Sequence, residues 1–197
     1  MRVLVVQAHP CADSFNAAVR DKAVAALEAA GHEVRVADLY AEGFDPVMGA
    51  EERRRYHDRG ENEKPVAGEI ERLLWAEGLV FVYPTWWFGL PAILKGWLDR
   101  VFVPHVTFTM PPGPDGLKGR LQSIRAISVV TTCGATWFVS KLMGEPGRRT
   151  ILRGIRALCH RRCRTRYHAL YQMDTVSLDA RTRFLAEVDT AMRRFGR

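Results

Sequence analysis

Residues 78–102, GLVFVYPTWWFGLPAILKGWLDRVF, contain the strand, loop and helix that decide the fold. The opening run is apolar throughout, as in a strand that is buried on both faces of a parallel sheet. Three aromatic residues follow it, and from Pro91 onward apolar residues recur at helical spacing. The stretch therefore predicts a strand and a helix joined by an aromatic loop, a place where an open α/β sheet can bind a flat ligand.

The segments on either side repeat this alternation of strand and helix. Apolar or alternating runs predict strands at residues 2–8, 33–39 and 123–132, and a fifth near 166–173. Helices are expected at residues 14–30, 68–75 and 178–195, a short helix within 49–59, and a long surface loop at 103–122.

Such alternation implies a parallel sheet covered by helices on both faces and linked by right-handed crossovers. Five strands favour a flavodoxin-like three-layer α/β sandwich with the strand order 2-1-3-4-5, in one domain over residues 1–197. In that order the loops after the first and third strands meet, so a ligand is expected there.

Composition and charge bear on where the protein is expected and on which partners it binds. No apolar run approaches the roughly 20 residues of a membrane span, and the apolar start is too short for a secretory signal, so we expect a cytoplasmic protein without membrane insertion. Residues 148–197 hold 13 arginines and four acids, giving +9 within a net charge of +7. Arginine outnumbers lysine 24 to 5 over the whole chain, and no RNA-binding signature accompanies the basic part, so no nucleic-acid partner is expected.

Two of the four cysteines invite comparison with a zinc site. Cys159 and Cys163 lie near His168, but three residues separate them instead of the usual two, and no second ligand pair follows. The intervening and following arginines would also repel a cation. We therefore expect free thiols and no metal.

The loop after the first strand carries short polar side chains at the start of a helix. His9, Ser14 and Asn16 lie there, and a helix N-terminus favours a phosphate group. Ser14 can equally be only a helix cap, and His9 an ordinary polar residue. Both interpretations remain open at this point.

The loops after the third and fourth strands supply aromatic and polar groups. Trp86 and Trp87 can stack on a flat ring, but they can also belong to the core or to a dimer interface. Thr131, Thr132, Cys133 and neighbouring Gly134 offer hydroxyl groups and amides for the polar edge of a ring, or form an ordinary turn.

Three strings resemble the NAD(P)H:quinone oxidoreductase (DT-diaphorase-like) family: WFGLPAILKGW at 87–97, the AHP…SFN loop at 8–16 and ADLYAEGFDP at 37–46. The resemblance is strongest at 79–102 and weak after 135. It implies a flavin whose phosphate is held by His9, Ser14, Phe15 and Asn16. It also implies that Trp87 and Phe88 flank the ring, that backbone of Pro84, Thr85 and Trp86 lines it, and that Thr131, Thr132, Cys133 and Gly134 bind its polar edge. The family reads T-T-G-G where this chain has Thr131 to Gly134, so Cys133 replaces a glycine, and a positive φ there would be costly.

The resemblance further implies hydride transfer from NAD(P)H through FAD, or alternatively FMN, to a quinone-like acceptor in a ping-pong reaction. The family's tyrosine–histidine pair is missing from the segment after Gly134, so no acid or base residue is assigned. Phe108 and Met110 are candidates, with Trp87 and Phe88, for contact with the acceptor, in a site shared by two subunits of a homodimer. A core role for Phe108 remains equally open at this point. Relatives of this fold also act as ancillary regulatory subunits of potassium efflux systems. Docking on a transporter, or a protein without redox turnover, is therefore the alternative.

Overall fold

The computed structural model describes residues 1–110 and 116–197 and contains a five-stranded parallel sheet. Its strands stand in the order β2-β1-β3-β6-β7. Their bounds are β1 Arg2–Gln7, β2 Glu33–Asp38, β3 Gly78–Thr85, β6 Ala126–Cys133 and β7 Arg164–Leu170. Numbered within this sheet alone, the order is 2-1-3-4-5, which confirms the predicted flavodoxin-like sandwich.

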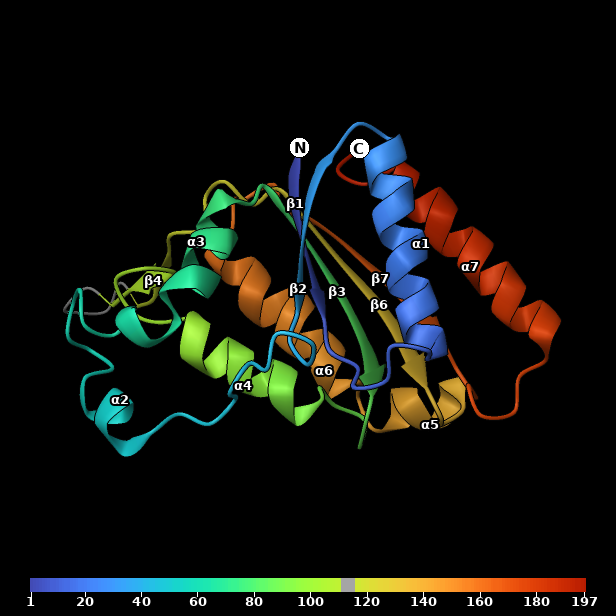
Figure 1. Cartoon of the computed structure of the whole chain (residues 1–197), viewed down its shortest axis with the longest axis horizontal. Coiled ribbons are helices and arrows are strands. Elements are labelled where there is room, and N and C mark those ends of the chain that lie inside the picture. The colour runs from blue at the N-terminus through green and yellow to red at the C-terminus, as the bar shows by residue number, and fades with distance from the viewer. Residues whose placement is uncertain (111–115) are drawn as a thin grey trace.

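Helices cover both faces of the sheet (Figure 1). One face carries α1 (Phe15–Ala29) and α7 (Leu178–Arg193), which pack side by side. The other carries α3 (Ala67–Trp75), α4 (Ala92–Val101), α6 (Pro146–Arg149) and the π-helical turn Thr150–Ile155. Two short helices lie outside these layers: α2 (Ala50–Arg54), and α5 (Trp137–Leu142) beside the carboxyl ends of the strands.

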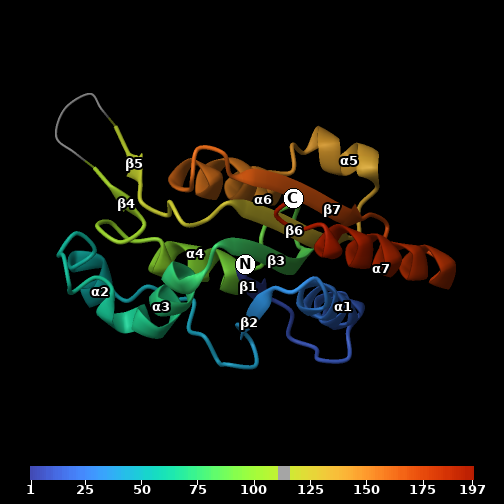
Figure 2. The same ribbon diagram turned by 90° about the horizontal axis from the view of Figure 1, so that it is seen from above.

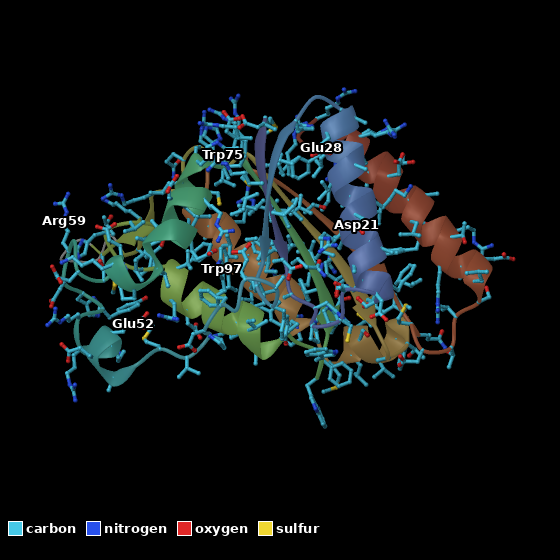
Figure 3. All side chains as sticks on the ribbon, viewed as in Figure 1. Asp21, Glu28, Glu52, Arg59, Trp75 and Trp97 are labelled. Carbon is cyan, nitrogen blue, oxygen red and sulfur yellow. The ribbon has the colours of Figure 1, made fainter. Side chains whose placement is uncertain are left out.

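Alternation along the strands divides the core into two parts. Val80 and Val82 of β3 face α1 and α7, whereas Leu79 and Phe81 face α3 and α4. Trp97 is fully buried between α4 and the sheet (Figure 3), and its Nε1 donates to Glu69 Oε2 at 2.7 Å. A buried indole N–H thereby has the partner that burial requires.

Several predicted boundaries differ from the structure. The fourth and fifth strands occupy 126–133 and 164–170 rather than 123–132 and 166–173, and Pro91 is the N-cap of α4 rather than its first helical residue. The predicted long surface loop at 103–122 includes two short antiparallel strands that the sequence did not indicate, β4 (Phe108–Thr109) and β5 (Lys118–Gly119). Val103 and Leu121 at its ends are buried in the core, which anchors the hairpin. Figure 2 shows this hairpin at the opposite end of the molecule from α5.

None of the helices within residues 1–110 and 116–197 is long and apolar enough to cross a membrane.

Candidate active site

A cavity of about 690 Å³ opens at the carboxyl edge of the sheet. Because β1, β3 and β6 are neighbours, the loops that follow them meet there. Its lining residues are His9, Pro84, Thr85, Trp86, Trp87, Phe88, Thr132, Cys133, Gly134, Ala135, Ser140, Met173 and Asp174. The cavity therefore lies where the strand order predicted a ligand.

The aromatic loop after β3 is a tight turn with an unusual backbone. Gly89 N donates to Trp86 O at 2.9 Å, and the two central residues, Trp87 and Phe88, have φ of 48° and 61°. Left-handed backbone costs roughly 1–2 kcal/mol per residue outside glycine. Trp87 is nevertheless 95% exposed, so packing of its own side chain does not offset this cost. Strain of this kind concentrates where a ligand is bound.

Some residues of the loop after β1 line the cavity, and others pack at the start of α1. His9 lines the cavity: its Nδ1 accepts from Cys11 N at 3.0 Å, and its ring lies 6.3 Å from that of Trp86. Ser14 Oγ caps α1 by accepting from Ala17 N at 3.1 Å. The Phe15 ring packs 6.4 Å from Phe184, on the α7 side.

Asn16 is buried and accepts from the side chain of Gln7 at 3.1 Å. Ser14, Phe15 and Asn16 thus lie outside the cavity lining, at the start of α1, where the amides of Phe15 and Asn16 have no intrahelical acceptor. Their contact with a phosphate stays a prediction.

At the end of β6, three of the four predicted residues line the cavity. Thr132, Cys133 and Gly134 do so, whereas Thr131 is fully buried with its Oγ1 2.8 Å from Thr85 Oγ1. Cys133 does not adopt the left-handed region, so replacement of a glycine here brings no backbone strain. Burial raises the pKa of its thiol, which therefore stays protonated at neutral pH.

A charged cluster lies directly behind this wall, and the sequence did not point to it. Glu145 is buried; its Oε2 accepts from Lys141 at 2.6 Å and Arg148 at 2.8 Å, and its Oε1 accepts from Tyr171 at 2.7 Å. Burial opposes ionisation, but the hydrogen bonds from Lys141, Arg148 and Tyr171 outweigh it and hold the pKa of Glu145 below its ordinary value.

The Glu145 cluster lies next to the cavity, because some residues of the cavity lining also border the cluster. Thr85, Phe88 and Cys133 line both the main cavity and a small pocket that Glu145 and Arg148 close from behind. A Cβ on Gly147 would lie 3.2 Å from the backbone of Gly89, so glycine there lets α6 approach the aromatic loop closely.

Sequence reasoning missed Ala135, Ser140, Met173 and Asp174 of the lining, together with the Glu145 cluster. The one local signal was the Gly144-Glu145-Pro146 turn, in which proline marks the start of a helix. Met173 and Asp174 follow β7, far along the chain from the other lining residues, as does Tyr171 of the Glu145 cluster. Only packing of β7 against β6 brings them to the cavity.

The two residues of the hairpin do not join this cavity. Phe108 packs against the larger core cluster and Met110 is exposed, and neither lies in the lining. Contact of both residues with an acceptor therefore stays a prediction for a site that a second copy completes.

No group of three or more His, Cys, Asp or Glu side chains suited to a metal occurs among the residues that the structure describes. Cys159 and Cys163 are buried free thiols.

An open parallel sheet with an aromatic cavity at its carboxyl edge defines an α/β protein of the flavodoxin-like class. The sequence matches the family described as having a flavodoxin-like fold over residues 1–192. Together with the relatives below, this match shows that the chain belongs to the flavodoxin-like NAD(P)H:quinone oxidoreductase family.

The relatives agree with the resemblance seen in the sequence. NAD(P)H dehydrogenase (quinone) 1 from Cavia porcellus is 35% identical over 150 residues, covering 68% of this chain and 54% of that protein. Ribosyldihydronicotinamide dehydrogenase (quinone) from Homo sapiens is 32% identical over 157 residues, covering 71% and 67%. The chain thus spans about half the length of the Cavia and Rattus NAD(P)H dehydrogenases that it matches.

A solved structure of NAD(P)H:quinone oxidoreductase from Methanothermobacter marburgensis superposes with a TM-score of 0.82 at 27% identity, covering 98% of each chain. Smu.1420 from Streptococcus mutans superposes with a TM-score of 0.84 at 31% identity, covering 98% of this chain and all of the other.

Proposed function

We propose that the protein is a flavin-dependent oxidoreductase that takes hydride from NAD(P)H and passes it to a quinone-like acceptor. The observation that carries the proposal is the cavity at the carboxyl edge, with the strained Trp87-Phe88 turn at its mouth. The printed names of the relatives, NAD(P)H dehydrogenase (quinone) and NAD(P)H:quinone oxidoreductase, support the donor and the acceptor class.

The residues present fit a flavin. A cavity of about 690 Å³ is within the range of small-molecule sites. Within the described part of the chain, the amides of Trp87, Phe88 and Gly134 make no hydrogen bond, so these donors are free for the polar edge of a ring. FAD is the proposed form and FMN the alternative. When bound, the flavin accepts and releases the hydride, and the protein supplies position and charge.

Each part of the wall has a distinct task in this proposal. Trp87 and Phe88 flank the ring and exclude water, while backbone of Pro84, Thr85 and Trp86 fixes its edge. Thr132, Cys133 and Gly134 hold the pyrimidine side. The start of α1, with Ser14 and Asn16, binds phosphate near His9.

The Glu145 cluster sets the charge behind the ring. One carboxylate between Lys141 and Arg148 leaves one net positive charge close to Cys133. Positive charge in a partly buried place stabilises a ligand that gains negative charge. No residue is assigned as acid or base, because hydride transfer itself requires none.

A homodimer would complete the site. Helix α5 borders the cavity through Ser140, yet it exposes Trp137, Phe138 and Leu142, and Met143 follows it on the surface. Adjoining exposed apolar residues mark an interaction surface. A two-fold dimer in which this surface of each copy contacts the hairpin of the other would bring Phe108 and Met110 of the second copy to the cavity of the first.

The decisive experiment is to purify the protein, record its visible absorption, and identify the released ligand by chromatography. We expect bound flavin, or stoichiometric reconstitution with FAD or FMN, and parallel-line kinetics with NAD(P)H and a quinone. A colourless protein that takes up neither flavin would refute the enzyme proposal. Flavin binding without turnover would instead favour the regulatory alternative.

A further inference from the structure

A second cavity, of about 430 Å³, lies at the opposite edge of the sheet from the candidate active site. It is bounded by the first residues of β6 and β7 and by the C-terminal end of α7. These ends of the three elements lie near both chain termini in Figure 1. Ala126 and Cys133, at the two ends of β6, line the second and the first cavity respectively. At roughly 3.3 Å per residue the two cavities are about 20 Å apart.

Four arginines surround this second cavity: Arg164 and Arg166 from β7, and Arg194 and Arg197 from the end of the chain. None of them forms a salt bridge with an acidic side chain in the described part of the chain, although Arg72, Arg100 and Arg148 elsewhere do. All four are exposed residues, and they come from two elements that line one cavity. An anion placed among them would accept charge-assisted, bidentate hydrogen bonds.

Buried polar atoms distinguish this cavity from an ordinary solvated basic surface. Ser128 is only 1% exposed, lines the cavity, and its Oγ has no hydrogen-bond partner. His168 Nε2 is also buried without a partner. Each such atom costs about 1–3 kcal/mol while it is unsatisfied. Both residues line the cavity, so the oxygens of one ligand are suitable partners for these two atoms.

The charge of His168 is set by its surroundings. Burial lowers the pKa of its ring, Glu187 acts in the opposite direction, and Arg166 lowers it again. The ring is therefore neutral near pH 7 and, in the tautomer with hydrogen on Nε2, donates one hydrogen bond without adding charge.

The apolar wall of the cavity depends on a close fit at the chain end. A Cβ on Gly78 would come within 2.5 Å of the Phe195 ring, so glycine there lets the ring pack beneath the sheet. Gly196 follows with φ of +80°, which turns Arg197 back toward the cavity. Phe195 is only 6% exposed, but it lines the cavity beside the four arginines.

We propose that this cavity binds a small phosphomonoester, with its phosphate among Arg164, Arg166, Arg194 and Arg197, an oxygen on Ser128 and His168, and its carbon portion against Phe195. Because Ser128 is buried in the wall of the cavity, a ligand must enter the cavity to contact it, which favours a small monoester over a nucleic-acid backbone or a membrane surface. The site is separate from the proposed flavin cavity, because the two cavities share no lining residue.

Binding of phenyl phosphate and of inorganic phosphate to the full-length protein by calorimetry tests this proposal. We expect phenyl phosphate to bind more tightly than phosphate, since only the ester reaches Phe195 with its ring. Arg166→Gln should weaken binding by at least about tenfold, the effect of losing one charge-assisted pair, and Ser128→Ala should weaken it severalfold. The control is Arg183→Gln, the same charge change on the exposed surface of α7, which should leave affinity within about twofold.

Three results would overturn the proposal. They are absence of binding at millimolar phenyl phosphate, equal losses in Arg166→Gln and Arg183→Gln, and binding of RNA or anionic vesicles that phenyl phosphate does not displace. Should Ser128→Ala fold poorly, Arg194→Gln makes the same test from an exposed position. Flavin uptake of each variant, measured in parallel, keeps the outcome separate from the proposed enzyme function.

Discussion

Trp87 and Phe88 show how two residues can be unfavourable for folding and suited to binding. Both occupy left-handed backbone in a turn that glycine or asparagine would form more easily. Neither gains enough contact to explain this cost: Trp87 is almost fully exposed and Phe88 only partly buried. Contact with a stacked ligand would offset this backbone strain.

Replacement of Trp87 by glycine is therefore expected to raise stability while it lowers flavin affinity. Glycine relieves about 1 kcal/mol of backbone strain, and little buried area is lost. Urea unfolding and flavin titration measure the two effects. Trp87→Ala is the matched control, because it removes the indole but keeps the strain: its flavin affinity should fall equally, without the gain in stability. Unchanged flavin affinity in both variants would remove Trp87 from the site.

Glu145 predicts a pH dependence of stability. Its pKa is lower in the folded protein than in the unfolded chain, so the carboxylate contributes stability above the unfolded pKa. That contribution is lost as pH falls through the folded pKa. Glu145→Gln should cost about 1–3 kcal/mol at pH 7, since Lys141 and Arg148 lose their shared partner.

The difference between wild type and Glu145→Gln should shrink on acidification, as measured by urea unfolding at a series of pH values. The control is Glu51→Gln, which breaks exposed pairs with Arg54 and Arg55 and should change stability little. A difference that stays constant down to pH 3, or grows, would contradict the assigned linkage.

Helix α4 packs closely against the loop between β2 and α2, because Gly96 at the contact has no side chain. A Cβ on Gly96 would lie 2.3 Å from Pro46 O and 2.4 Å from Pro46 Cβ, so the helix and the loop backbone can approach this closely only at a glycine. Arg100, one turn later on α4, pairs with Glu52 at 2.9 Å and extends the same contact toward α2.

Gly96→Ala is expected to destabilise the protein by about 1–3 kcal/mol, because α4 or the loop at Pro46 must shift. Gly68→Ala in α3 is the matched control, since its Cβ would meet nothing within 4 Å. That change should be neutral or stabilise by up to about 1 kcal/mol through the helix propensity of alanine. Thermal unfolding distinguishes the two, and equal effects would mean that the loop yields freely.

At the scale of the molecule, the exposed apolar surface of α5 predicts association. Leu142 is 73% exposed and neighbours Trp137 and Phe138. In the proposed dimer this surface is covered, so Leu142→Glu should weaken association by at least about tenfold, or 1.4 kcal/mol. Sedimentation velocity measures the shift toward monomer. Leu178→Glu, at an equally exposed leucine that begins α7, is the control and should leave the association unchanged. A wild-type protein that remains monomeric would contradict the proposed two-copy site.

The main strands and helices could be predicted because their signals are local. An apolar run or an apolar period can be recognised within one segment. β1 and β3 are largely continuous apolar runs of six and eight residues, and α4 has apolar residues at helical spacing over ten. Prediction failed where elements are shorter: α5 and α6 span six and four residues, too few to show a period. At residues 103–122 the prolines and glycines hid the fact that Val103 and Leu121 are buried.

The sequence by itself determined the strand order, the place of the cavity and its aromatic loop, because these follow from the order of elements and from one string of residues. Tertiary structure alone decided which groups surround that loop. Glu145 accepts a hydrogen bond from Tyr171, 26 residues further along the chain. Trp87 and Phe88 adopt their left-handed turn only in the folded chain. Packing also gathers Ser128 and four arginines at the far edge of the sheet. Close contacts between backbones and buried polar atoms without partners arise only when separate segments pack together. They therefore cannot be predicted from the sequence of any single segment.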